Sequence, residues 1–199
     1  MTFNDRSTPL SLLATRRSAK ARDLVAPAPG ADELADILAI ATRTPDHGKL
    51  APWRFIMVPA EARDALAAGI IDAYRAEKPS AGRLEIEAMD QFARQAPALV
   101  VVLASPKVES HIPLWEQELS VGAATMNLLH AVHASGYAGC WLTGWAAYSD
   151  RVRDLFGAAP ERIAGFVFIG TPGKPLEERP RPDRDKVVAT WAGTATDGI

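Results

Sequence analysis

Seven consecutive apolar residues, ALVVVLA from Ala98 to Ala104, make the longest purely apolar run in the chain. Such a run is typical of a central β-strand that is buried on both faces, and Pro97 ends a predicted helix just before it. The run is far shorter than the roughly 20 residues that a membrane-spanning helix needs. The sequence therefore predicts a domain built around a buried strand, and no membrane helix.

Helices and strands alternate on both sides of this run. We predict further strands at residues 54–59, 136–144 and 164–175, and helices that start at Pro9 and near Ala31 and that cover residues 60–78 and 84–95. This order, with about four short strands, indicates an α+β fold. A chain of 199 residues fits one domain, so we expect a single domain over residues 1–199 with a C-terminal arm over about residues 176–199.

The longest predicted helix, residues 115–135, has almost no polar face. A helix that is apolar nearly all round is buried, either in the core or in a subunit interface. The tail is rich in proline and charge until Val187, Val188 and Trp191, and we interpret it as an arm that lies on something, such as a partner subunit.

Charge and composition exclude several classes of protein. The formal net charge of -2 argues against general nucleic-acid binding, and the basic clusters at residues 16–20 and 179–186 are better interpreted as local anion sites. The first ten residues lack the apolar core of a secretory signal. The lone Cys140 excludes an internal disulfide, so we expect a reducing, cytoplasmic setting.

Side chains that carry hydrolytic or metal chemistry are few. We expect Cys140 to be a buried, inert thiol between Gly139 and Trp141. His130 and His133 lie three residues apart on the long helix without a recognisable third ligand, so we expect no metal site. Neither GxGxxG nor GxxxxGK[ST] occurs, so the usual phosphate-binding loops of Rossmann and P-loop proteins are absent from the sequence.

Four other segments remain as candidates: TRRSAKA (15–21), RTPDHGKLAPWRF (43–55), GCWLTG (139–144) and RPRPDR (179–184). On the residues alone, Arg16 and Arg17 are explained as solvated cations at a helix end, where they favour the helix dipole. The alternative is a bound dianionic phosphate that draws the separate basic segments together.

The order and spacing of RRSAKA, PDHGKLAPWRF, GCWLTG and IGTPGKP resemble the FMN-dependent nitroreductase family, and in particular its compact branch with a Pro-Asp-His loop. The resemblance extends from about Leu10 to Trp191. It implies a nitroreductase-like fold, with a central, mostly antiparallel sheet flanked by helices. It also implies a homodimer with interface helices and with FMN sites at the subunit interface.

The resemblance also implies roles for residues near the two ends of the chain. Arg16, Arg17 and Ser18 would bind the FMN phosphate and ribityl chain, and Arg181 would add to the phosphate site. Lys20 would lie near N1 and O2 of the flavin, where negative charge develops on reduction. Lys20 is therefore the one residue to which we assign a catalytic role, the tuning of the flavin.

Further roles fall in the middle of the chain. Arg43 and His47 match positions that reach FMN from the other subunit of the homodimer. The strand that lies along the isoalloxazine, and that presents backbone groups near N5, is matched by Trp141, Leu142, Thr143 and Gly144.

By the same resemblance, the protein would transfer a hydride from NAD(P)H through FMN to a nitroaromatic, quinone or similar acceptor. A flavin would explain why the chain offers no nucleophile with a base, since the cofactor carries the chemistry. Two alternatives stay open at this point: an FMN-binding protein of the same fold with non-reductase flavin chemistry, and a non-enzymatic module that binds a phosphate ligand.

Overall fold

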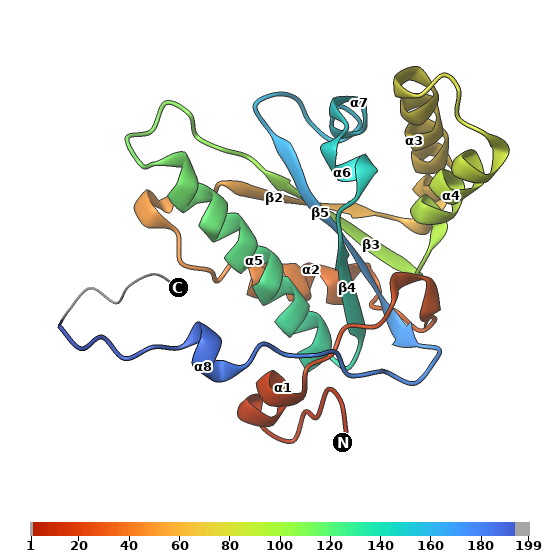
Figure 1. Ribbon diagram of the computed structural model, residues 1–199. Coiled ribbons are helices and arrows are strands. Elements are labelled where there is room, and N and C mark those ends of the chain that lie inside the picture. Colours follow the sequence, from red (N-terminus) through yellow and green to blue (C-terminus); the bar gives the residue numbers. More distant parts are fainter. Residues whose placement is uncertain (1, 194–199) are drawn as a thin grey trace.

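The computed structural model describes residues 2–193 and has a five-stranded antiparallel sheet at its centre (Figure 1). The long strand β5 pairs with three others, in registers that place Val167 opposite Val100, Phe168 opposite Cys140 and Pro172 opposite Leu24. β2 completes the sheet through its pairing with β3. The strands are β1 (Leu24–Val25), β2 (Trp53–Val58), β3 (Ala98–Ala104), β4 (Ala138–Leu142) and β5 (Arg162–Pro172).

The predicted central strand is confirmed: every residue of β3 is buried. Its side chains alternate between two hydrophobic clusters, because successive residues of a strand point to opposite faces of the sheet. Leu99, Val101 and Leu103 belong to one cluster, whereas Val100 and Val102 belong to the other. A strand between two cores must be apolar throughout, which is the pattern that the sequence shows.

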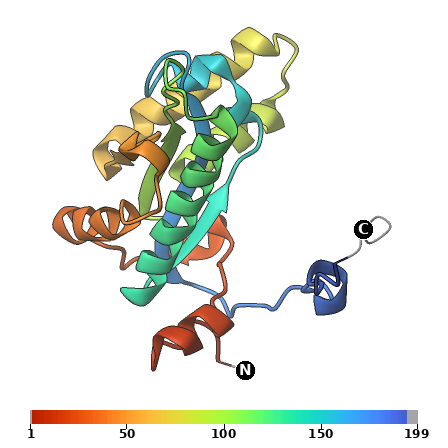
Figure 2. The same cartoon turned by 90° about the vertical axis from the view of Figure 1, so that its left-hand side faces the viewer.

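Each face of the sheet is covered by a pair of long helices. α2 (Ala31–Ala41) and α5 (Leu114–Ala134) contribute to the cluster of Val100, and α3 (Arg63–Glu77) and α4 (Arg83–Arg94) to the cluster of Leu99. Figure 2 shows α5 lying across the strands. None of the helices in the described part of the chain is long and apolar enough to cross a membrane.

Short helices and turns connect these layers. At the start of α1, Thr8 accepts a hydrogen bond from the Ser11 amide and Pro9 occupies the first turn, as the sequence predicted. Ser149 caps α7 in the same way, by accepting from the Val152 amide. The short elements are α1 (Pro9–Thr15), α6 (Trp145–Tyr148), α7 (Asp150–Arg153), α8 (Arg184–Val187) and the 3₁₀ turns η1 (Ala21–Asp23), η2 (His47–Lys49) and η3 (Ala60–Ala62).

The long helix α5 buries only one side against its own chain. Val121, Leu128 and Val132 are almost fully buried, whereas Trp115 and Leu119 on the opposite side are 68% and 53% exposed. The sequence allowed two explanations for this apolar helix, burial in the core or in a subunit interface. Burial in the core of its own chain accounts for one side of the helix only.

The predicted arm leaves the body of the molecule after β5 (Figures 1 and 2). Its base is fixed, because the Arg17 Nε donates a hydrogen bond of 2.7 Å to the Glu177 carbonyl. Farther along, Val187, Val188 and Trp191 are exposed. Residues 194–199 of the predicted arm lie outside the described residues.

Candidate functional site

A cleft of about 570 Å³ brings the segment after α1 together with β4 and with the tail. Residues distant in the sequence meet here because β4 pairs with β5, and the chain beyond β5 returns past the segment after α1. The volume is in the range of small-ligand sites. The cleft is lined by Arg16, Arg17, Ser18, Ala19, Lys20, Ala21, Arg22, Gln95, Leu129, Cys140, Trp141, Leu142 and Arg179.

One side of the cleft concentrates positive charge. Arg16 Nη1 donates to the Ser18 hydroxyl at 3.3 Å, so both polar groups lie together in the lining. Burial and the neighbouring guanidinium groups of Arg181 and Arg17 lower the pKa of Arg16, since each disfavours its charged form. A bound anion would offset this repulsion through charge-assisted hydrogen bonds.

Arg17 and Lys20 differ from Arg16 because each contacts the acidic base of the tail. Arg17 is only 8% exposed, and its Nε lies 2.7 Å from the Glu177 carbonyl and 3.7 Å from Glu178 Oε1. The Lys20 ammonium is half-exposed and lies 3.6 Å from Glu177 Oε2. Arg17 therefore fastens the tail, whereas Lys20 is held by a single surface ion pair that contributes little to rigidity.

The floor of the cleft is apolar and comes mainly from β4. Cys140 is buried, as the sequence predicted, and this burial raises the pKa of its thiol. The Trp141 indole is fixed by a hydrogen bond of 3.0 Å from its Nε1 to the Ala164 carbonyl. Thr143 and Gly144 follow directly at the end of β4 but do not line the cleft, and Gly144 turns the chain into α6 with a φ of 91°.

His47 lies at the other end of α5, whereas Arg43 lies beside the same helix nearer the cleft, with its carbonyl oxygen 3.5 Å from Asn127 Nδ2. His47 Nδ1 is 2.7 Å from Glu116 Oε2, in the first turn of this helix, whereas Leu129 near its C-terminal end lines the cleft. At a rise of about 1.5 Å per residue, about 20 Å of helix separates Glu116 from Leu129. Neither Arg43 nor His47 lines the cleft of its own chain, and the contact predicted for both is with a ligand bound by a second subunit.

Arg179 and Gln95 are among the cleft-lining residues that the sequence-based assignment of the site missed. Arg179 lines the cleft, while the predicted Arg181 pairs with Glu178 at 3.0 Å and does not. The alternation of arginine and proline in this tail has no helix or strand period that would show which arginine faces the cleft. Gln95 directly follows α4, and an isolated glutamine at a helix end carries no signal.

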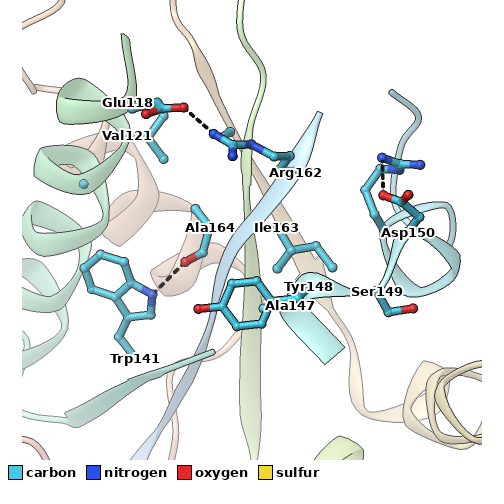
Figure 3. A pocket seen from close by; sticks show the side chains of 13 residues that line it. Glu118, Val121, Trp141, Ala147, Tyr148, Ser149, Asp150, Arg162, Ile163 and Ala164 are labelled. Atoms are coloured by element: carbon cyan, nitrogen blue, oxygen red, sulfur yellow. Dashed lines mark hydrogen bonds and ion pairs between the residues drawn. The ribbon is translucent and has the colours of Figure 1, made fainter. Parts of the chain in front are cut away.

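A second pocket, of about 410 Å³, lies on the other side of Trp141 (Figure 3). Figure 3 shows Tyr148 extending across it toward Trp141, with the ion pair between Glu118 and Arg162 on its far side. Trp141 therefore separates the pocket from the cleft. The pocket is lined by Ala104, Glu118, Val121, Gly122, Trp141, Ala147, Tyr148, Ser149, Asp150, Arg153, Arg162, Ile163 and Ala164.

The two helix histidines considered as ligands are not part of a metal cluster. His133 is fully buried, and its Nδ1 lies 2.6 Å from the Leu129 carbonyl, to which only a protonated nitrogen can donate. Among residues 2–193, there is no group of three or more His, Cys, Asp or Glu side chains that could hold a metal ion.

Comparisons with known proteins agree on one family. Residues 13–171 match the model of the "Nitroreductase family". The chain is 35% identical over 168 residues to the "Putative NAD(P)H nitroreductase YdjA" of Escherichia coli strain K12, a match that covers 82% of this chain and 87% of that protein.

Solved structures share the fold. The "Nitroreductase-like Family Protein" from Bacillus cereus superposes with a TM-score of 0.80 at 21% identity, over 97% of this chain and 99% of that one. A variant of the "FMN and NADPH-dependent nitroreductase NfnB" from sphigopyxis sp. strain HMH gives a TM-score of 0.70 at 20% identity, over 94% and 100% of the two chains. The predicted sheet flanked by helices is thus confirmed as a nitroreductase-like fold.

Proposed function

Because this chain belongs to the nitroreductase family, we propose that it is an oxidoreductase that uses FMN to transfer a hydride from NAD(P)H to a nitroaromatic, quinone or similar acceptor. The family match and the relatives named as NAD(P)H nitroreductases support the oxidoreductase class. A structural neighbour named as FMN- and NADPH-dependent supports the choice of cofactor and electron donor.

The observation that carries the proposal is the composition of the cleft. A phosphate would be held beside Arg16 and Ser18, where guanidinium and hydroxyl donors converge, with Arg17 and Arg179 adding positive charge. The apolar floor of Trp141 and its neighbours suits a flat ring system. When bound, FMN would accept a hydride from one substrate and pass it to the next, and the chain's own residues bind and orient it.

Lys20 has a distinct part in this proposal. Its ammonium lies at the rim of the cleft with a half-exposed side chain, so it can turn toward a ligand at the cost of one surface ion pair with Glu177. A positive charge there would stabilise negative charge that develops on a reduced flavin. Thr143 and Gly144, at the end of β4, would offer backbone groups to the edge of the ring.

The proposal includes a homodimer in which each subunit completes the other's site. Trp115 and Leu119 on the outer side of α5, together with Val187, Val188 and Trp191 of the arm, expose apolar surface that a second copy would cover. His47 is too far from the cleft of its own chain to serve it, and Arg43 does not line that cleft. They would act on the partner's FMN.

The test is a titration of the purified protein with FMN, followed by its visible absorbance and then by oxidation of NADH or NADPH with a nitroaromatic or quinone. We expect bound flavin and turnover. Arg16→Ala should weaken FMN binding by about tenfold or more, because a charge-assisted hydrogen bond is lost. Arg75→Ala, which removes an exposed arginine of α3 outside the cleft, is the matched control and should bind FMN as the wild type does.

Two outcomes would contradict the proposal, and each selects one alternative. A protein that retains no flavin absorbance once unbound FMN has been removed does not bind FMN, which selects the module that binds another phosphate ligand. A protein that binds FMN but oxidises neither NADH nor NADPH with any acceptor tested performs flavin chemistry of another kind.

A further inference from the structure

We propose that Glu77, the last residue of α3, is a positioning residue that holds the turn between β4 and α6 at the edge of the cleft. The inference rests on the proposed function for the identity of the ligand, FMN. Its geometry comes from contacts between α3 and the segment of residues 143–149, none of which depends on a ligand.

Glu77 joins both ends of α6 with one carboxylate. Its Oε2 accepts a hydrogen bond of 3.1 Å from the indole Nε1 of Trp145, the first residue of α6. Its Oε1 accepts a bond of 2.6 Å from the hydroxyl of Ser149, the residue that ends α6 and caps α7. A single side chain therefore fixes the whole of this short helix, which is too short to be stable by itself.

The Glu77 carboxylate lies at the end of α3 where the helix dipole disfavours an anion. The C-terminal end of a helix carries partial negative charge, so an anion in the last turn of α3 is repelled. Within residues 2–193, Glu77 forms no ion pair that would offset this repulsion. The two donors from α6 and α7 supply the compensation, which explains why a carboxylate is stable at this position.

Trp145 is also held by Tyr74 of α3, which is itself bonded to α4. The Tyr74 ring meets it edge-on, with centroids 4.7 Å apart at 82°. The Tyr74 hydroxyl in turn donates to Glu85 Oε1 of α4 at 2.8 Å and accepts from the Lys78 ammonium at 3.2 Å. The start of α6 is thus clamped between an aromatic contact and a charge-assisted hydrogen bond.

The position of α6 decides the shape of two neighbouring sites. Three residues upstream of Trp145, Leu142 lines the cleft, and between them Gly144 has a φ of 91° and no atom within 4 Å of the position of a Cβ. On the other side, Tyr148 and Ser149 line the second pocket. Glu77 therefore anchors the far side of the turn of residues 143–144, whose backbone would face a bound ring.

The test compares Glu77→Ala with Asp72→Ala, which removes an exposed carboxylate from the same helix and so matches the change in charge. Amide hydrogen exchange of the FMN-free protein is measured first. We expect Glu77→Ala to speed exchange in residues 143–152 selectively, with the β3 amides unchanged, and Asp72→Ala to leave both as in the wild type. Affinity for FMN should then fall about tenfold in Glu77→Ala alone, as expected for loss of a charge-assisted anchor.

Two further variants isolate the contact. Trp145→Phe keeps the ring against Tyr74 but removes the indole donor, so its effect should not add to that of Glu77→Ala in the double variant. Glu77→Gln keeps an acceptor for Trp145 and a group that can bond Ser149, and should restore most of the protection.

Equal exchange in Glu77→Ala and Asp72→Ala, or a uniform increase over all segments, would overturn the positioning role. Additive effects of Glu77→Ala and Trp145→Phe would do so as well. If the wild type fails to bind FMN, the proposed function fails, while the exchange measurements on the FMN-free protein still decide the role of Glu77.

Discussion

The three basic side chains that follow α1 contribute unequally to the stability of the fold and to ligand binding. Arg17 is buried and bound to the tail backbone, so its removal would loosen the tail as well as the cleft. Arg16 bonds Ser18 within the cleft lining and makes the cleaner probe of anion binding. The structural contribution of Lys20 is intermediate between those of Arg16 and Arg17, because its one ion pair, with Glu177, is exposed to solvent.

We expect Lys20→Ala to retain FMN but to slow its reduction by NAD(P)H by roughly 10–100-fold, since a preorganised charge near developing negative charge is lost. Anaerobic single-turnover reduction, followed by flavin absorbance, measures this step. Lys174→Ala, which also removes a lysine near the tail, is the control, because Lys174 pairs with Asp23 outside the cleft lining. Identical single-turnover rates in Lys20→Ala and the wild type would refute the role.

The buried His133 makes stability depend on pH. Burial lowers its folded-state pKa to about 4, from an ordinary value of about 6.5. Between these values the unfolded chain binds a proton that the folded protein excludes, so the free energy of unfolding falls as pH falls through this window and is fully restored above it. We expect a loss of about 2 kcal/mol between about pH 7.5 and about pH 5.

Urea denaturation at the two pH values measures this loss, and His133→Gln should remove most of it. Burial and the nearby Arg16 also lower the pKa of His130, so His130→Gln is the comparison and should remove a smaller share. Carboxylates with lowered pKa values, such as Glu85, lose their stabilising effect only at lower pH. An unchanged pH slope in His133→Gln would assign the effect to other groups.

Between elements, the closest packing near the site is that of β4 on β5. A Cβ on Gly165 would overlap the Trp141 indole and would lie 3.0 Å from the Leu142 carbonyl oxygen. We expect Gly165→Ala to displace the indole, to break its bond to Ala164 and to lower the free energy of unfolding by about 1–3 kcal/mol. Because Trp141 separates the cleft from the second pocket, FMN affinity should fall too.

Chemical denaturation and an FMN titration check both effects. Gly30→Ala is the control, since no atom lies within 4 Å of a Cβ there and an alanine at this helix cap should cost only about 1 kcal/mol or less. Adding Trp141→Ala to Gly165→Ala should produce less than the sum of the two losses, because the overlapping group is gone. Strict additivity of the two changes would show that the overlap is not the cause.

Elements with a strong local signal were predictable from the sequence. The apolar run of β3, the start of α1 at Pro9 and the long helix α5 were all expected. β1 and α6 were not, because two paired residues and a single helical turn are shorter than any periodicity can reveal. Both are specified by tertiary contacts, β1 by its pairing with β5 and α6 by Glu77.

For the site, the resemblance selected two of the segments that line the cleft, residues 16–20 and 141–142. Their roles toward FMN stay predictions. Pattern alone did not identify Arg179 or Gln95, because a side chain's direction in an irregular tail or at a helix end is set by packing across the chain. The second pocket went unpredicted for the same reason, since six separate elements meet to form it.

At the scale of the whole molecule, the cleft of one subunit does not bring together all the residues that the proposed function uses. The outer side of α5 and the arm expose apolar surface, His47 lies about 20 Å of helix away from the cleft, and Arg43 does not line the cleft. A dimer through these surfaces explains these observations together. We therefore expect a dimeric mass in native mass spectrometry, and a monomer that still binds FMN tightly would contradict it.

Mixed dimers can decide whether Arg43 acts on the partner's site. In a dimer of one Arg16→Ala chain and one Arg43→Ala chain, contribution from the partner puts both changes in the same site and leaves the other site intact. Half of the sites should then bind FMN as the wild type does, and the rest about tenfold or more weakly. If Arg43 served its own chain, each site would carry one change and none would be intact.

The two chains can be purified together by different affinity tags and titrated with FMN by absorbance. A mixed dimer of Arg16→Ala with Arg75→Ala is the matched control, because it keeps one intact site whichever subunit supplies Arg43. Tight binding at half of the sites in the control and at none in the test dimer would rule out the shared site. Equal stoichiometry in the two, together with weakened FMN binding by a dimer of two Arg43→Ala chains, would establish that each flavin is bound by both subunits, through Arg16 of one and Arg43 of the other.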